Sequence, residues 1–367
     1  MGDEYGRFFS LLKRLSDSFG VSGFEDEIRS IVVEELREVA DELRVDRFGN
    51  VIAVKRGSRG APKVLWDAHM DEIGFLVKHV DEKGFVYLYP IGGWSPRVLP
   101  GQRVRILAED GSIVRGVIGV KPPHLLSPEE KDKVIPIDKL FVDIGVTSRE
   151  EAEKLGVTVG RPVDLDREAV RLAGTRVTGK AFDDRVGVAV LIEAFRLLDG
   201  QEPSVYLVVA VQEETGLKGA RVASQVLQPD AAIAVDVTPT DDVPGASGPR
   251  STELGKGPVI ELADGRSGSG LISHPVMVKL LEETAKELGI GIQKEVLGGG
   301  TTDGAIIALA GRGVPTVTVS VPTRYIHSPV ELLDLKDAVA TVKLVARATE
   351  KITADWYARN LEEKRIK

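Results

Sequence analysis

The chain has 367 residues, of which 43% are hydrophobic, and this length and composition predict a globular protein of about two domains. Its net charge of −8 argues against nucleic-acid binding, because nucleic-acid-binding surfaces carry concentrated basic residues. The absence of cysteine excludes disulfides and thiolate metal ligands, and no apolar run reaches the roughly 18 residues of a membrane span. We therefore expect a cytoplasmic protein without membrane segments, in which any metal ion is bound by His, Asp or Glu.

The N-terminal segment predicts two helices and then two strands. Within residues 5–45, apolar side chains recur at helical spacing around Leu11 and Leu15, and a second amphipathic run covers 25–43. Residues 50–54 and 63–68 predict strands, because they are apolar runs separated by a turn-rich segment.

The pattern changes between residues 73 and 166, where short β-type runs alternate with glycine-containing turns. These runs cover 75–80, 85–91, 103–108, 113–120 and 140–146, and in this region we predict a helix only at 148–155. Such a composition predicts a small, mostly antiparallel barrel or sandwich.

Helices and strands alternate from residue 184 onward. The predicted helices cover 186–198, 217–227, 275–288, 304–310 and 335–352, and the predicted strands cover 205–211, 231–237, 258–261 and 314–321. This alternation is typical of an α/β domain with a mostly parallel central sheet flanked by helices. The sequence therefore predicts a discontinuous α/β domain, 1–72 and 167–367, with a β-rich insertion at 73–166.

Acidic residues and histidines occur where predicted strands end, which is where open α/β sheets bind ligands. His69 and Asp71 are two residues apart on an extended segment, so they share a face, and Asp71 is suited to orient a metal-binding His69. Asp183 and Asp184 precede an apolar helix. One of them could simply cap that helix, with Asp183 reaching a site and Asp184 capping or pairing with Arg185.

Three further segments fit the same pattern. Glu213 and Glu214 follow the strand at 205–211, Asp236 is the only charged residue in an apolar strand, and His327 follows the strand at 314–321. Each of them could also be a solvent-exposed strand end. Together, two histidines and three carboxylates suit a pair of zinc-like ions bridged by one carboxylate. The other histidines lack this setting and are predicted to be surface or packing residues: His79, His124 and His274.

Five motifs resemble those of one known family, in order and over essentially the whole chain. They are AHMDEIGF at 68–75, GKAFDDRVG at 179–187, VQEETGLKGA at 211–220, VDVTP at 235–239 and RYIHSPVE at 324–331. The set resembles the TET-type dinuclear metal aminopeptidases, which are relatives of glutamyl and deblocking aminopeptidases, and some of which are labelled cellulases or endoglucanases.

The resemblance implies two divalent metal ions per subunit, with Zn²⁺ expected and Co²⁺ or Mn²⁺ also compatible with the ligands. It implies that Asp183 bridges both ions, that His69 and Asp236 complete one site, and that Glu214 and His327 complete the other.

The resemblance also implies a reaction and an assembly. A water activated by both cations would attack the first peptide bond of a short peptide, with Glu213 as general base and Asp71 orienting His69. The insertion would be a dimerisation domain, and dimers would assemble into a tetrahedral dodecamer.

Other functions remain open from the residues. A metal-dependent deacylase or carboxypeptidase would use similar ligands, a glycoside hydrolase would use an acid pair, and a binding scaffold would need no general base. Side-chain preference is also open: Lys218 or Arg250 would favour acidic residues if either faced the pocket. The loop at 298–303 suits either close approach to substrate or a turn with Asp303 near a helix N-cap.

Overall fold

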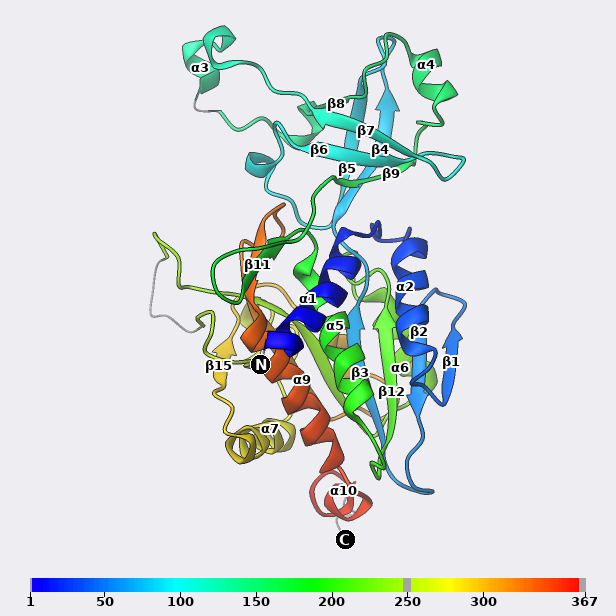
Figure 1. The fold of residues 1–367 in the computed structure, drawn as a ribbon, viewed down its shortest axis with the longest axis vertical. Coiled ribbons are helices and arrows are strands. Elements are labelled where there is room, and N and C mark those ends of the chain that lie inside the picture. Colours follow the sequence, from blue (N-terminus) through cyan, green and yellow to red (C-terminus); the bar gives the residue numbers. More distant parts are fainter. Residues whose placement is uncertain (1, 132, 247–251, 363–367) are drawn as a thin grey trace.

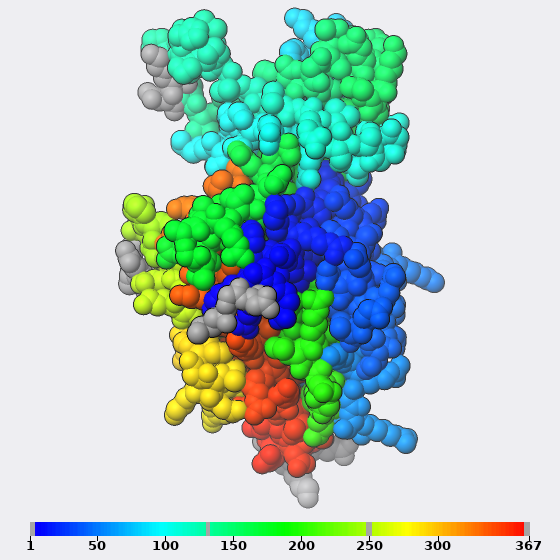
Figure 2. Space-filling model, viewed as in Figure 1, coloured from blue at the N-terminus to red at the C-terminus, as the bar shows by residue number. Residues whose placement is uncertain are grey.

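The computed structural model describes residues 2–131, 133–246 and 252–362 and has two parts (Figure 1). A sheet flanked by helices forms the larger part, and a closed barrel stands at one end of it. In the space-filling view, the N-terminal helices lie directly beneath the barrel (Figure 2).

The larger part is built on a sheet of 11 strands among the described residues, in the order β1-β2-β12-β3-β13-β16-β17-β11-β10, with β14 and β15 branching from β16. The strands are β1 (Glu42–Val45), β2 (Val51–Lys55), β3 (Lys63–His69), β10 (Val170–Arg171), β11 (Arg176–Gly179), β12 (Ser204–Ala210), β13 (Ala231–Pro239), β14 (Val259–Ala263), β15 (Gln293–Val296), β16 (Thr316–Arg324) and β17 (Glu331–Asp334). The four central strands β12, β3, β13 and β16 are parallel, and antiparallel pairs extend the sheet on both sides. The carboxyl ends of the four central strands therefore meet at one edge.

Helices cover both faces of this sheet, which explains why the central strands are almost continuously apolar. One face packs against α1 (Gly2–Asp17), α2 (Asp26–Leu36), α5 (Phe182–Leu197), α7 (Pro275–Leu288) and α9 (Leu335–Glu350). The other face packs against α6 (Lys218–Leu227) and α8 (Gly304–Ile307). The chain continues into α10 (Ala354–Asn360), and a 3₁₀ turn, η4 (Arg266–Gly268), follows β14.

The barrel closes in the order β4-β5-β8-β7-β6-β9 and encloses its own apolar core. Its strands are β4 (Gly74–Val80), β5 (Val86–Ile91), β6 (Arg103–Leu107), β7 (Ile113–Ile118), β8 (Phe141–Asp143) and β9 (Pro162–Leu165). Short helical segments lie between them: η1 (Pro96–Val98), η2 (Pro123–Leu125), α3 (Pro128–Lys131), η3 (Ile137–Lys139) and α4 (Arg149–Lys154).

The structure confirms the predicted fold class, an α/β domain with a parallel sheet centre and a small barrel. The barrel strands lie between Gly74 and Leu165, but the division into domains at residues 73 and 166 stays a prediction. In the part of the chain that the structure describes, none of the helices has the length and apolarity needed to cross a bilayer.

Two local predictions were wrong. The helix predicted over 25–43 ends at Leu36, and Leu43 lies in β1, which pairs with β2 along the sheet edge. Residues 148–155 are not the only helical segment of the insertion, since α3 is also helical. The prediction also missed β9, β10, β11, β15, β17 and α10, which are short and lack a clear apolar period.

Candidate metal centre and active site

Strand ends of the central sheet bring the predicted site residues together. His69 is the last residue of β3, Glu213 and Glu214 follow β12, and Asp236 lies near the end of β13. His327 follows β16. Asp183 joins them from the first turn of α5, which begins beside the same edge. We call these six residues the acid–histidine cluster.

Two groups within the cluster have the geometry of cation sites. His69, Asp183 and Asp236 each offer a ligand atom, and these atoms lie within 4.8 Å of one another; the same holds for Asp183, Glu214 and His327. Asp183 belongs to both groups: its Oδ1 lies 3.2 Å from His69 Nε2, and its Oδ2 lies 3.1 Å from His327 Nε2. The two oxygens of one carboxylate therefore face two different imidazoles.

Glu213 lies beside these groups. Its Oε2 is 3.8 Å from His69 Nε2, and His69, Glu213 and Glu214 form a third set of atoms within 4.8 Å of one another. Because Glu213 is buried and faces the same space as the other carboxylates, it can reach a molecule bound between them.

Asp71 supports both the first histidine and the glutamate pair. Its backbone oxygen lies 3.2 Å and its Oδ1 3.5 Å from His69 Nδ1. Its carboxylate accepts hydrogen bonds from the amides of Glu213 (2.9 Å) and Glu214 (3.3 Å) and from Ser22 Oγ (2.6 Å). Burial alone would raise the pKa of Asp71, but the hydrogen bonds with His69, Ser22 and Glu213 lower it. Asp71 therefore stays ionised and can hold His69 in one orientation.

Asp184 has the capping role that the sequence left open. Its Oδ1 accepts a hydrogen bond from the Gly187 amide at 3.0 Å, and its Oδ2 accepts one from the His69 amide at 3.2 Å. Arg185 does not pair with it and instead contacts Glu72. The peptide bond between Asp183 and Asp184 is cis.

Glu331 was missed by the sequence prediction, although it ends the RYIHSPVE motif. Its carboxylate is buried and accepts hydrogen bonds from the amides of Asp183 and His327, both at 2.9 Å. Burial and the nearby Asp183 raise the pKa of Glu331 to about 8. Glu331 therefore ties together the two segments that carry Asp183 and His327. In the sequence, the only local sign of Glu331 is that this acidic residue directly precedes two apolar residues, Leu332 and Leu333.

Asp67 and Asp303 form a second missed feature behind the cluster. Both are buried, and neither carboxylate accepts a hydrogen bond from a donor in the described residues. Burial raises the pKa of Asp67 to about 7, and burial together with Asp67 raises the pKa of Asp303. Asp303 occupies the N-cap position of α8, as the alternative prediction stated, but its side chain does not cap the helix.

Burial shifts the ionisation of the cluster itself. It raises the pKa of Glu213 and of Asp236, and neighbouring carboxylates add to this effect. Burial alone would lower the pKa of His327, but hydrogen bonds to Asp183 and Glu214 raise it to about 11. The cluster thus concentrates negative charge away from water, a condition that bound cations relieve. Its oxygen and nitrogen donors fit divalent ions of the zinc type.

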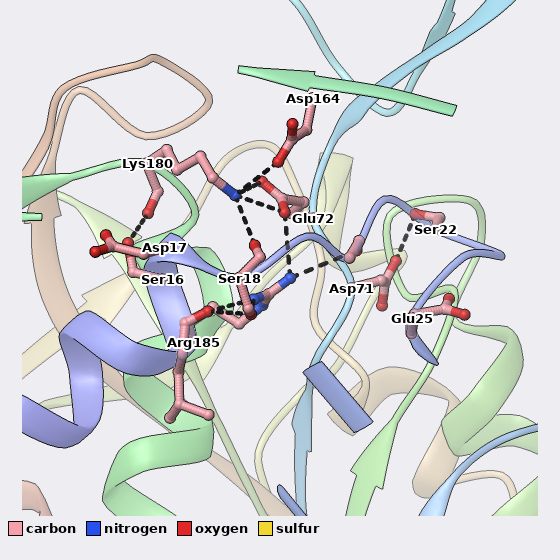
Figure 3. A network of polar contacts seen from close by, with 12 residues as sticks. Ser16, Asp17, Ser18, Ser22, Glu25, Asp71, Glu72, Asp164, Lys180 and Arg185 are labelled. Atoms are coloured by element: carbon pink, nitrogen blue, oxygen red, sulfur yellow. Dashed lines mark hydrogen bonds and ion pairs between the residues drawn. The ribbon is translucent and has the colours of Figure 1, made fainter. Parts of the chain in front are cut away.

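A second set of buried charges lies where the barrel meets the sheet (Figure 3). Lys180 Nζ lies 2.6 Å from Glu72 and 3.2 Å from Asp164 of β9, and it donates to the Ser18 carbonyl at 3.0 Å. Arg185 reaches Glu72 at 3.3 Å, and Arg105 of β6 donates to Asp164 at 2.9 Å. We call these five residues, Glu72, Arg105, Asp164, Lys180 and Arg185, the junction cluster. It fixes the chain directly after Asp71 and on both sides of Asp183.

The remaining histidines stay outside these groups, as predicted. His79 stacks on Tyr87, with ring centroids 4.3 Å apart, and His274 precedes α7. Among the described residues, the groups able to hold a metal do not include His79, His124 or His274.

A cavity of about 380 Å³ opens beside the acid–histidine cluster. Residues 299–302 of the glycine-rich loop line it, and the close approach of this loop to a substrate stays a prediction. Lys218 is exposed, and its Nζ donates to Thr215 Oγ1 at 2.9 Å. Arg250 lies outside the described residues.

The chain matches known proteins over most of its length. Residues 49–344 match the family model described as M42 glutamyl aminopeptidase. The chain is 41% identical over 348 residues to the lysyl aminopeptidase of Pyrococcus furiosus. The aligned region covers 94% of this chain and 97% of that protein.

Solved structures are similar over nearly the whole chain. An aminopeptidase from the archaeon Desulfurococcus kamchatkensis is 42% identical, with a TM-score of 0.95 and 99% of both chains covered. The TET1 peptidase of Pyrococcus horikoshii, described as assembling into a tetrahedron or a large octahedral shell, is 36% identical. Its TM-score is 0.82, with 93% of this chain and 99% of that chain covered. These matches confirm the predicted resemblance and the class of peptide hydrolases.

Proposed function

Because the chain belongs to the M42 glutamyl aminopeptidase family, we propose that it removes N-terminal residues from short peptides at a centre of two divalent cations. His69, Asp183 and Asp236 would hold one cation, and Asp183, Glu214 and His327 would hold the other. Zn²⁺ is the expected ion, and Co²⁺ and Mn²⁺ suit the same donors.

One observation carries this proposal: the two oxygens of Asp183 face His69 and His327 separately, at 3.2 and 3.1 Å. A carboxylate in this position can bridge two ions. Because Asp183 would give one oxygen to each ion, five residues would supply three donor atoms to each of the two ions.

The chemistry divides between the cations and Glu213. When bound, two divalent cations lower the pKa of a water and stabilise negative charge on a carbonyl oxygen. Glu213 would accept a proton from the attacking water and pass it to the leaving amine. Glu213 suits this role because its carboxylate is buried and faces the space between the proposed metal ligands. Asp71 would keep His69 and the two glutamates in place.

The alternatives fit the site less well. A glycoside hydrolase needs two carboxyl groups on either side of a sugar bond, whereas the Glu213 and Glu214 carboxylates both face His69 in one metal-capable set. A metal-dependent deacylase or carboxypeptidase would use the same ligands but a different end of the substrate. Its products distinguish it from an aminopeptidase.

An assay with leucyl-p-nitroanilide and a short peptide, free or N-acetylated, tests the proposal. We expect hydrolysis of the free substrates, loss of activity after chelation, recovery with Zn²⁺, Co²⁺ or Mn²⁺, and no cleavage of the acetylated peptide. Full activity in protein shown to be free of metal would contradict the metal centre. Equal cleavage of the acetylated peptide would favour a deacylase or carboxypeptidase.

The wider organisation is also part of this proposal. We assign residues 73–166 as an inserted dimerisation domain, and we propose a cytoplasmic enzyme whose dimers assemble into a tetrahedral dodecamer. The assembly of the Pyrococcus horikoshii relative supports this idea, and exposed apolar side chains such as Val120 (61% exposed) and Leu125 (58%) lie in the barrel region. Light scattering coupled to gel filtration would measure the particle mass.

A further inference from the structure

The cavity beside the acid–histidine cluster has two kinds of wall. At one end it is bordered by the cluster, including His69 and Asp183. Elsewhere its large side chains are apolar: Leu217, Val237, Leu297 and Ile326. These four come from the segments that follow or end β12, β13, β15 and β16, so segments far apart in the chain contribute to the cavity. Its volume of about 380 Å³ is within the range of small-ligand pockets.

The apolar part of the cavity lacks a charged partner for a ligand. Of the described residues that line the cavity, the charged or titratable ones all belong to the acid–histidine cluster: His69, Asp183, Glu213, Glu214, Asp236 and His327. That cluster is committed to the cations and the reaction in the proposed function. A ligand group that extends away from the cluster therefore meets apolar side chains, threonines and glycine backbone.

Two basic side chains that adjoin the cavity walls in the sequence are engaged elsewhere. Lys218 follows Leu217, but its Nζ donates to Thr215 Oγ1 at 2.9 Å. Arg324 precedes Ile326 by two residues, but it holds both oxygens of Asp242, at 2.8 and 2.6 Å. Neither is among the residues that line the cavity.

We infer that this cavity receives the side chain of the N-terminal substrate residue and selects an apolar one, such as leucine or methionine, over lysine or glutamate. The inference rests on the proposed function. A leucine side chain would leave water and contact the four apolar residues. A lysine or glutamate side chain would lose hydration without gaining an ion pair, which opposes its binding. The chain would then differ in preference from the lysyl aminopeptidase to which it is similar.

The test measures kcat/KM for the p-nitroanilides of leucine, lysine and glutamic acid, using the full-length enzyme reconstituted with Co²⁺ or Zn²⁺. We expect leucine to exceed each charged substrate by about tenfold or more. A value for lysine or glutamate equal to or above that for leucine overturns the inference and leaves the proposed function intact. No release of p-nitroaniline from any of the three substrates, together with no release of any residue from free peptides, overturns the proposed function itself.

A variant tests whether Leu297 faces the substrate side chain. Leu297 is half-buried, follows β15 and is not a proposed metal ligand, so Leu297→Lys adds a cation to the apolar wall. We expect the ratio of kcat/KM for glutamate over leucine to rise about tenfold or more, while lysine stays poor. The control is Val226→Lys on α6, since Val226 is 69% exposed and does not line the cavity. An unchanged ratio in Leu297→Lys, or an equal rise in Val226→Lys, overturns the assignment.

Discussion

Two sets of buried charge lie close together in this protein, and they differ in balance. The junction cluster contains three basic groups, Arg105, Lys180 and Arg185, against the carboxylates of Glu72 and Asp164, and its members contact one another directly. The acid–histidine cluster contains four carboxylates against two imidazoles. A set in which every carboxylate contacts basic groups directly needs no ligand and supports the fold, whereas an excess of carboxylates held away from water calls for bound cations.

The comparison predicts that changing the acid–histidine cluster alters activity more than stability. Glu213→Gln removes the proposed base while the metal ligands stay, so we expect kcat to fall about a thousandfold with both metal ions retained. The measurement is kcat together with metal content by mass spectrometry. Glu34→Gln, on the exposed face of α2, is the matched control and should leave both unchanged. Unaltered turnover in Glu213→Gln would remove Glu213 as the base.

Changing the junction cluster should alter stability more than activity. Lys180→Met leaves Glu72 and Asp164 buried with one cation fewer, so we expect the free energy of unfolding to fall by about 3–5 kcal/mol. The control is Lys13→Met, whose partners Asp17 and Glu168 are partly or largely exposed, and we expect a loss below about 1 kcal/mol there. Denaturant unfolding at one protein concentration gives both values. Equal losses in the two variants would show that the junction cluster is no more important than a surface pair.

A smaller effect concerns the pH dependence of metal binding. In the metal-free protein, the pKa values of Glu213 and Asp236 are raised by burial, and that of His327 is raised to about 11 by its carboxylate partners. Groups with raised pKa values hold protons near neutral pH, and cation binding must displace those protons. Metal affinity should therefore rise with pH, about tenfold per unit for each proton released. Equilibrium dialysis at pH 6 and pH 8 measures this change. An affinity independent of pH would mean that the cluster is already ionised without metal.

Much of the acid–histidine cluster could be predicted because its residues follow apolar strands. His69, Glu214 and His327 come at the ends of runs whose apolar character already indicated buried parallel strands, and such ends meet at one edge. Glu331 could not be found in this way, because β17 is short and acquires its place only by pairing with β16 and β11. The contact of Asp67 with Asp303, and that of Lys180 with Glu72, depend on segments more than 100 residues apart in the chain. Local pattern carries no signal for such contacts.

The central claim is that this cluster holds two cations that share Asp183. Anomalous diffraction from crystals grown with Mn²⁺ or Co²⁺ tests it most directly. The account predicts two peaks, one among His69, Asp183 and Asp236 and the other among Asp183, Glu214 and His327. Peaks only at other places in the molecule, or a single ion without contact to Asp183, would contradict it.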